Sequence, residues 1–135
     1  MRLFFLLALV LLSFPLSVSA VSAQIPEDPL VKIRILPEKS QVVPGEEIWV
    51  GIEKSIAPHW HTYWRNPGDS GLPLRAKWEM PDGFDMGDIQ WPVPHTIPYE
   101  PLMNFGYEGS VILLQRLKVP ENLPEGALTF KATIE

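Results

Sequence analysis

Residues 59–73, HWHTYWRNPGDSGLP, are the stretch around which the rest of this chain is organised. Its first half holds three large aromatic residues, Trp60, Tyr63 and Trp64, and its second half is turn material. Asn66-Pro67 disfavours a helix, and the glycines supply backbone angles that other residues avoid. Because burial of large rings is strongly favourable, we expect a loop that folds back onto the domain. Such a loop is either a packed structural element or the wall of a site.

The first residues of the chain have the pattern of an export signal. Arg2 precedes an apolar run over residues 3–12, and small residues then lead to Ala20 and Ala23. The run is too short to span a bilayer, which takes roughly 20 apolar residues. We therefore predict a signal peptide over residues 1–23, cleaved after Ala20 or Ala23. The mature chain is then periplasmic and has no membrane span.

The mature region, residues 24–135, is long enough for one domain and too short for two. Loss of Arg2 leaves ten Lys and Arg against sixteen Asp and Glu, a net charge of −6. No basic patch stands out, which argues against nucleic acid as a partner. The chain contains no cysteine. It therefore has no catalytic thiol, and we expect no cofactor.

The mature chain reads as short strands separated by Pro and Gly turns. Alternating apolar and polar residues, or a continuous apolar run, predict strands over 31–35, 47–53, 75–80, 110–119 and from 128 onward. We expect the 110–119 strand to be central and buried on both faces, and residues 104–109 to form a second aromatic-glycine loop. The predicted fold is all-β, an immunoglobulin-like antiparallel β-sandwich. The last alternation runs to Glu135 without a turn, so we expect the domain to be incomplete at its C-terminus.

Two histidines raise the possibility of a metal site. His59 and His61 are two residues apart, so an extended backbone would project both to one face. Met80, Met86 and Met103 could add soft ligands for copper. The competing interpretation is that a histidine forms a hydrogen bond within the loop and the methionines fill the core.

Two further functions find less support in the sequence. Asp69-Ser70 near a histidine is compatible with a hydrolase, but no Gly-x-Ser-x-Gly motif is present and Ser is common in turns. Aromatic residues could also stack on a sugar. Trp49 and Trp78 fall on predicted strands, however, where a role in the sandwich core is the simpler interpretation.

Three stretches together resemble one known family. They are HTYWRNPGDSGLP at 61–73, IQWPVP at 89–94 and NFGYEG at 104–109. In order and spacing they are similar to the N-terminal periplasmic domain of DsbD-type thiol:disulfide interchange proteins, which are protein-disulfide reductases. The resemblance is strongest to the branch tied to suppression of copper sensitivity, and it implies roles in copper tolerance or cytochrome c maturation.

The resemblance implies a place in an electron-transfer chain. In this family an immunoglobulin-like domain precedes a membrane electron-transfer domain, which passes electrons to a cysteine pair and then to periplasmic thiol-disulfide proteins. The family's pair lies in or just after the strand that residues 128–135 begin. The cysteine-free chain is therefore expected to be redox-inert alone, as a truncated domain or as a scaffold. The alternative is a non-enzymatic periplasmic module that binds copper or a partner protein.

The resemblance also implies a cap loop that shields the redox centre. The matching residues are Asn104, Phe105 and Tyr107, with the two rings as covering groups. From the clustering of rings in residues 59–73, we infer a pocket wall made by Tyr63, Trp64 and Trp60.

Overall fold

The computed structural model describes residues 28–123 and 125–135, so the predicted signal peptide lies outside the described residues. All regular structure within the described part is β-strand, and every strand pair is antiparallel. The strands are β1 (Val31–Pro37), β2 (Glu47–Ile56), β3 (Thr62–Gly68), β4 (Ala76–Glu79), β5 (Asp85–Met86), β6 (His95–Tyr99), β7 (Leu102–Tyr107), β8 (Ser110–Lys118) and β9 (Lys131–Ile134). The all-β prediction is confirmed.

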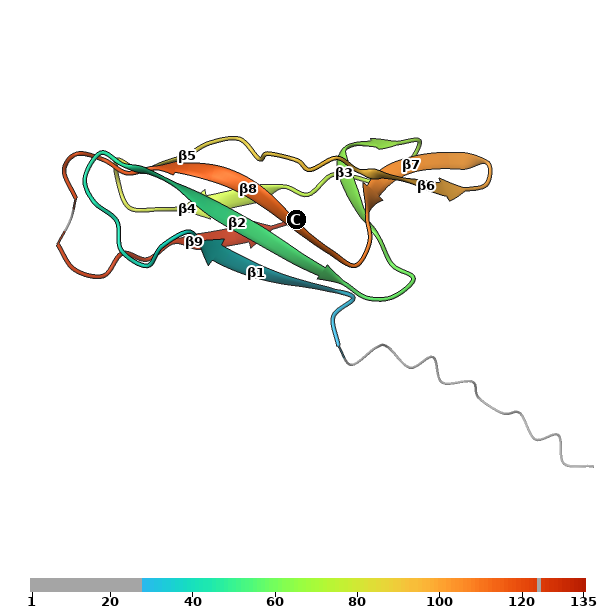
Figure 1. The fold of residues 1–135 in the computed structure, drawn as a ribbon, viewed down its shortest axis with the longest axis horizontal. Coiled ribbons are helices and arrows are strands. Elements are labelled where there is room, and N and C mark those ends of the chain that lie inside the picture. The colour runs from blue at the N-terminus through green and yellow to red at the C-terminus, as the bar shows by residue number, and fades with distance from the viewer. Residues whose placement is uncertain (1–27, 124) are drawn as a thin grey trace, which may run out of the picture.

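The strands form three sheets, and Figure 1 shows them with the long axis of the molecule horizontal. The largest has the order β1-β2-β8-β5, the second has the order β3-β7-β6, and the third pairs β4 with β9. The β4–β9 pair packs against β2 and β8, because Trp78 and Ile134 lie against the core cluster to which Ile52 and Leu113 belong. The β6–β7 hairpin lies at the end of the molecule that is farther from the β4–β9 pair (Figure 1).

The core follows from alternation on β2 and β8. Ile48, Val50 and Leu117 form one buried cluster, and Ile52 and Leu113 belong to a second cluster farther along the same strands. Because side chains alternate between the faces of a strand, the other set of residues faces outward. The predicted strands over 31–35, 47–53 and 75–80 are confirmed as β1, β2 and β4.

Three expectations about individual segments were wrong. Residues 59–73 are not a loop throughout, because Thr62–Gly68 form the strand β3. Residues 110–119 do form a central strand, β8, but it is buried on one face only: Ile112 is 42% exposed and Leu114 is 37% exposed. Its outward face carries the apolar residues Ile112 and Leu114 as well as polar residues, so the sequence shows an apolar run over residues 111–114 where the burial alternates. Residues 104–109 are not a loop, because all but the last two belong to β7.

In the part of the chain that the structure describes, no helix is long and apolar enough to cross a membrane.

Candidate functional site

The loop that follows β3 is fixed to β7 by four hydrogen bonds. The Asn104 side-chain oxygen Oδ1 accepts from the Ser70 backbone N–H and from the Ser70 hydroxyl, both at 3.0 Å. The Asp69 carboxylate accepts from the Met103 N–H at 2.8 Å, and the Asp69 N–H donates to the Met103 carbonyl at 3.0 Å. Asn104 is only 2% exposed, so its two bonds to Ser70 are shielded from water, whereas the bond between Asp69 and the Met103 N–H is exposed. The segments 59–73 and 104–109 therefore lie against each other, and the first of them folds back onto the domain as expected.

Two glycines allow this close approach. Gly68 has φ 88°, and a Cβ at this position would lie 2.3 Å from the Met103 carbonyl oxygen. Gly71 also has φ 88°, and its missing side chain leaves the space that the Tyr63 ring occupies. The sequence pattern of this loop thus has a direct physical cause.

The three aromatic residues of the predicted wall have different environments. Tyr63 is half-buried and lies edge-on to His61, with ring centroids 5.1 Å apart. Trp64 packs against the second core cluster, and its buried indole Nε1 has no hydrogen-bond partner among the described residues. Trp60 is 51% exposed. The structure therefore brings Tyr63 and Trp64 to the domain body and leaves Trp60 facing solvent.

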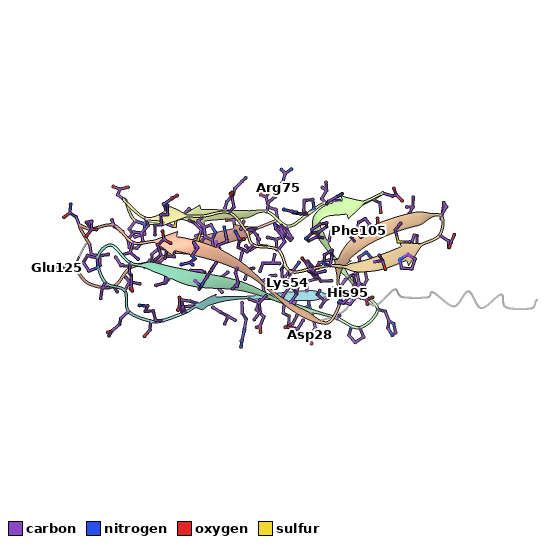
Figure 2. The ribbon with its side chains drawn as sticks, turned by 45° about the horizontal axis from the view of Figure 1, so that its top comes forward. Asp28, Lys54, Arg75, His95, Phe105 and Glu125 are labelled. Atoms are coloured by element: carbon purple, nitrogen blue, oxygen red, sulfur yellow. The ribbon has the colours of Figure 1, made fainter. Side chains whose placement is uncertain are left out.

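The two rings assigned to the cap differ in burial. Tyr107 is 3% exposed, packs in the second core cluster, and donates its hydroxyl to the Pro92 carbonyl at 2.7 Å. Burial raises the pKa of Tyr107 to about 12, with the charge of Arg65 opposing the shift. Phe105 is half-buried on β7 and belongs to neither core cluster (Figure 2). Tyr107 is thus a core residue on a strand, and Phe105 remains the candidate for a covering ring.

The possible metal ligands do not converge. Among the described residues, no group of three or more His, Cys, Asp or Glu side chains could hold a metal ion. His59 has φ 68°, an uncommon angle outside glycine, and is exposed. Met80 and Met86 pack against the first core cluster, and Met103 is 42% exposed.

The structure also contains a buried lysine that the sequence analysis missed. Lys54 lies on β2, is 1% exposed, and donates from Nζ to the Thr62 hydroxyl at 2.8 Å. Its Nζ also lies 5.1 Å from the centroid of the Tyr107 ring. The signal was available, since Lys54 follows Ile48, Val50 and Ile52 at a spacing of two. A lysine in phase with core residues of a strand points inward.

Lys54 borders a cavity of about 290 Å³. Its apolar lining comes from Val31, Ile33, Leu72, Leu74 and Ile134. Besides Lys54, the polar residues that line it are His61, Thr62, Tyr63 and Glu135. The cavity therefore combines an apolar wall with one buried ammonium group. Of the three rings predicted to form a wall, Tyr63 lines this cavity and Trp60 and Trp64 do not.

The contacts of Asn104 predict a measurable role in fixing the loop. We expect Asn104→Ala to lower the free energy of unfolding by about 1–2 kcal/mol, because the Ser70 N–H loses its acceptor. Urea denaturation measures this loss, and hydrogen exchange of the Ser70 amide should become faster. A double-mutant cycle with Ser70→Ala isolates the hydroxyl contact. Unchanged exchange at Ser70 would show that Asn104 does not fix the loop.

The antiparallel sheets and the packing of β4–β9 on β2 and β8 define an immunoglobulin-like β-sandwich. Residues 32–135 match the family model for the N-terminal region of the thiol:disulfide interchange protein DsbD, and the chain belongs to this family.

One solved structure with the same fold is the N-terminal periplasmic domain of ScsB from Proteus mirabilis. The TM-score is 0.58 at 21% sequence identity, over 82% of this chain and 47% of that one. The chain thus spans about half the length of that structure. No curated protein matches the chain.

Proposed function

We propose that this chain is the periplasmic N-terminal domain of a DsbD-like thiol:disulfide interchange system that passes electrons to periplasmic acceptors. The family match over residues 32–135 carries the proposal. The likeness in fold to a periplasmic domain, and the export signal predicted for residues 1–23, support a periplasmic location. Its partners are then a membrane electron-transfer domain and periplasmic thiol-disulfide proteins, with copper tolerance or cytochrome c maturation as the processes served.

The absence of cysteine from the sequence limits what the chain does within such a system. Thiol–disulfide exchange needs a thiolate that attacks a disulfide sulfur. A chain without cysteine cannot supply this thiolate, so its role in the electron-transfer system is to present a binding surface to the other components. The purified chain should therefore reduce insulin with dithiothreitol no faster than the buffer control.

A test in cells measures the redox state of the proposed acceptors. In a strain that lacks the gene, free thiols are trapped with a maleimide reagent that retards migration on a gel. We expect at least one periplasmic thiol-disulfide protein to become more oxidised than in the parent strain, and the restored gene to reverse the change. An unchanged redox state of all such proteins, with the gene expressed in the parent, contradicts the proposal.

Phe105 belongs to the segment that the family resemblance assigns to a cap loop, and we propose it as the covering ring of that cap. Because it lies in neither core cluster, we expect Phe105→Ala to lower the free energy of unfolding by ~1 kcal/mol or less. Thermal and urea unfolding of the purified protein provide the measurement. A loss of about 3–5 kcal/mol would instead identify Phe105 as a core residue.

A further inference from the structure

The charge of Lys54 is incompletely paired within the protein. An ammonium group has three N–H donors, and the structure gives Lys54 one hydrogen bond, to the Thr62 hydroxyl. Among the described residues, no carboxylate lies within ion-pair distance of its Nζ. A charge buried without a counter-charge is costly, and such groups are normally paired. Two of the three N–H donors of Lys54 therefore have no acceptor among the described residues.

The other charged group at the cavity does not fill this role. Glu135 also lines the cavity, but its carboxylate lies 3.6 Å from the Lys77 Nζ and its side chain is 55% exposed. The remaining polar lining consists of an imidazole and two hydroxyl groups, from His61, Thr62 and Tyr63. The Tyr107 ring below Lys54 offers the face of its π-system and no formal charge. Lys54 is therefore the buried cation that borders a mainly apolar cavity.

We propose that this cavity binds a small monocarboxylate with a short apolar body, whose carboxylate pairs with Lys54. The apolar wall suits a hydrocarbon chain, and the Thr62 hydroxyl lies close enough to Lys54 to share the anion. An engineered cavity of roughly 150 Å³ binds benzene, so a cavity of this size suits a chain of about eight carbon atoms. Pockets that hold ligands commonly have this design, an apolar lining with a few polar groups that fix orientation.

The protonation state of Lys54 is consistent with a site for a carboxylate. Burial lowers the pKa of Lys54 to about 8, so most of the protein carries the ammonium form at pH 7. A bound carboxylate stabilises the charged form and raises this pKa. Binding should therefore weaken as the pH rises above 8 and the amine loses its proton. His61, Tyr63 and Glu135 are the other titratable groups at the cavity, and Glu135 would act against an anion.

Three ligands of equal chain length test the proposal on the unchanged protein. Octanoate, octan-1-ol and octylammonium are titrated at pH 7 by calorimetry, and the Lys54 Cε resonance is followed by NMR. We expect octanoate to bind at least about 10-fold more tightly than octan-1-ol, octylammonium to bind most weakly, and octanoate to raise the Lys54 pKa. Equal affinity for octanoate and octan-1-ol overturns the proposal, and so does the absence of binding by all three.

Two variants separate the charge of Lys54 from general effects. Lys54→Met keeps the length of the side chain and removes its charge, so the preference for octanoate over octan-1-ol should fall to about one. Lys118→Met is the matched control, because Lys118 is an exposed lysine on β8 in the same sheet. The control should keep the full preference. A preference that survives in Lys54→Met shows that another group selects the anion, and this result overturns the proposal.

Discussion

Replacement of Lys54 with methionine should stabilise the fold, by about 2–3 kcal/mol in the free energy of unfolding at pH 7. The reason is the cost of burying the Lys54 ammonium without a counter-charge, which lowers its pKa to about 8. Methionine has similar length, fits irregular apolar space and carries no charge. Urea denaturation of the two proteins at 25 °C measures the difference.

The gain in the free energy of unfolding that we expect for Lys54→Met should decrease as the pH rises. The folded pKa of Lys54, about 8, lies below its unfolded value of about 10.4, so the unfolded state binds more protons between these two values. The stability contributed by this group therefore rises with pH across that window in the native protein. The variant lacks this rise, so its advantage should be largest below pH 8 and should disappear above about pH 10.5.

The comparison between native and variant proteins removes other alkaline effects. The pKa of Tyr107 is raised to about 12 by burial, so its ionisation disfavours the folded state above about pH 10 in both proteins. Lys118→Met should show almost no change in stability, because the side chain of Lys118 is solvated. If Lys54→Met destabilises the protein at pH 7, the buried ammonium stabilises the fold and the cavity is better described as a structural feature.

Strands with regular alternation could be predicted from the sequence because their burial has the same period as their polarity. β1, β2 and β4 have one face toward the core, and their apolar residues mark that face. The prediction failed on β3 and β7, where aromatic residues, glycines and Asn104 occupy both faces. Gly106 of β7 has no side chain because a Cβ there would lie 2.1 Å from the Thr62 carbonyl oxygen. Such a contact between strands depends on how the strands pair, and strand pairing cannot be predicted from the local sequence of either strand.

The candidate site was predicted in part for the same reason. The turn residues between Asn66 and Pro73 indicated a fixed loop, and the structure shows it bonded to β7 through Asp69 and Ser70. That Asn104 supplies the hydrogen-bond acceptor for Ser70 could not be predicted, since Asn104 and Ser70 are 34 positions apart in the chain. Lys54 was missed because lysine is usually exposed, and this general tendency outweighed its position in phase with the core.

The same strand, β3, links the two surfaces to which the proposals assign a role. Thr62 at its start holds Lys54 and borders the cavity, and Gly68 at its end lies against β7. β3 and β7 are hydrogen-bonded at both ends, with a register shift between Tyr63 and Gly68. A change at the Gly68 end is therefore expected to disturb the loop first and the cavity second.

Replacement of Gly68 with alanine should lower the free energy of unfolding by about 3 kcal/mol, because two separate costs combine. The first is the backbone angle, φ 88°, which disfavours any residue with a Cβ. The second is the contact between the new methyl group and the Met103 carbonyl oxygen, which would be 2.3 Å away and belongs to backbone that cannot rotate aside. Relief of this contact requires β3 and β7 to move apart.

Gly109→Ala separates these two costs, since Gly109 also has a positive φ, 67°, but no atom lies within 4 Å of the position of its Cβ. The control variant should therefore lose only about 1 kcal/mol, which is the cost of the backbone angle. Urea denaturation of both variants gives the difference, and faster hydrogen exchange at the Ser70 and Met103 amides would locate it at the loop. Equal losses of free energy of unfolding in the two variants would mean that β7 can move away from residue 68 at Met103 without a measurable loss of stability. The loop would then owe its position to its hydrogen bonds with Asn104 and Met103, because the tight packing of backbone on backbone would contribute nothing measurable.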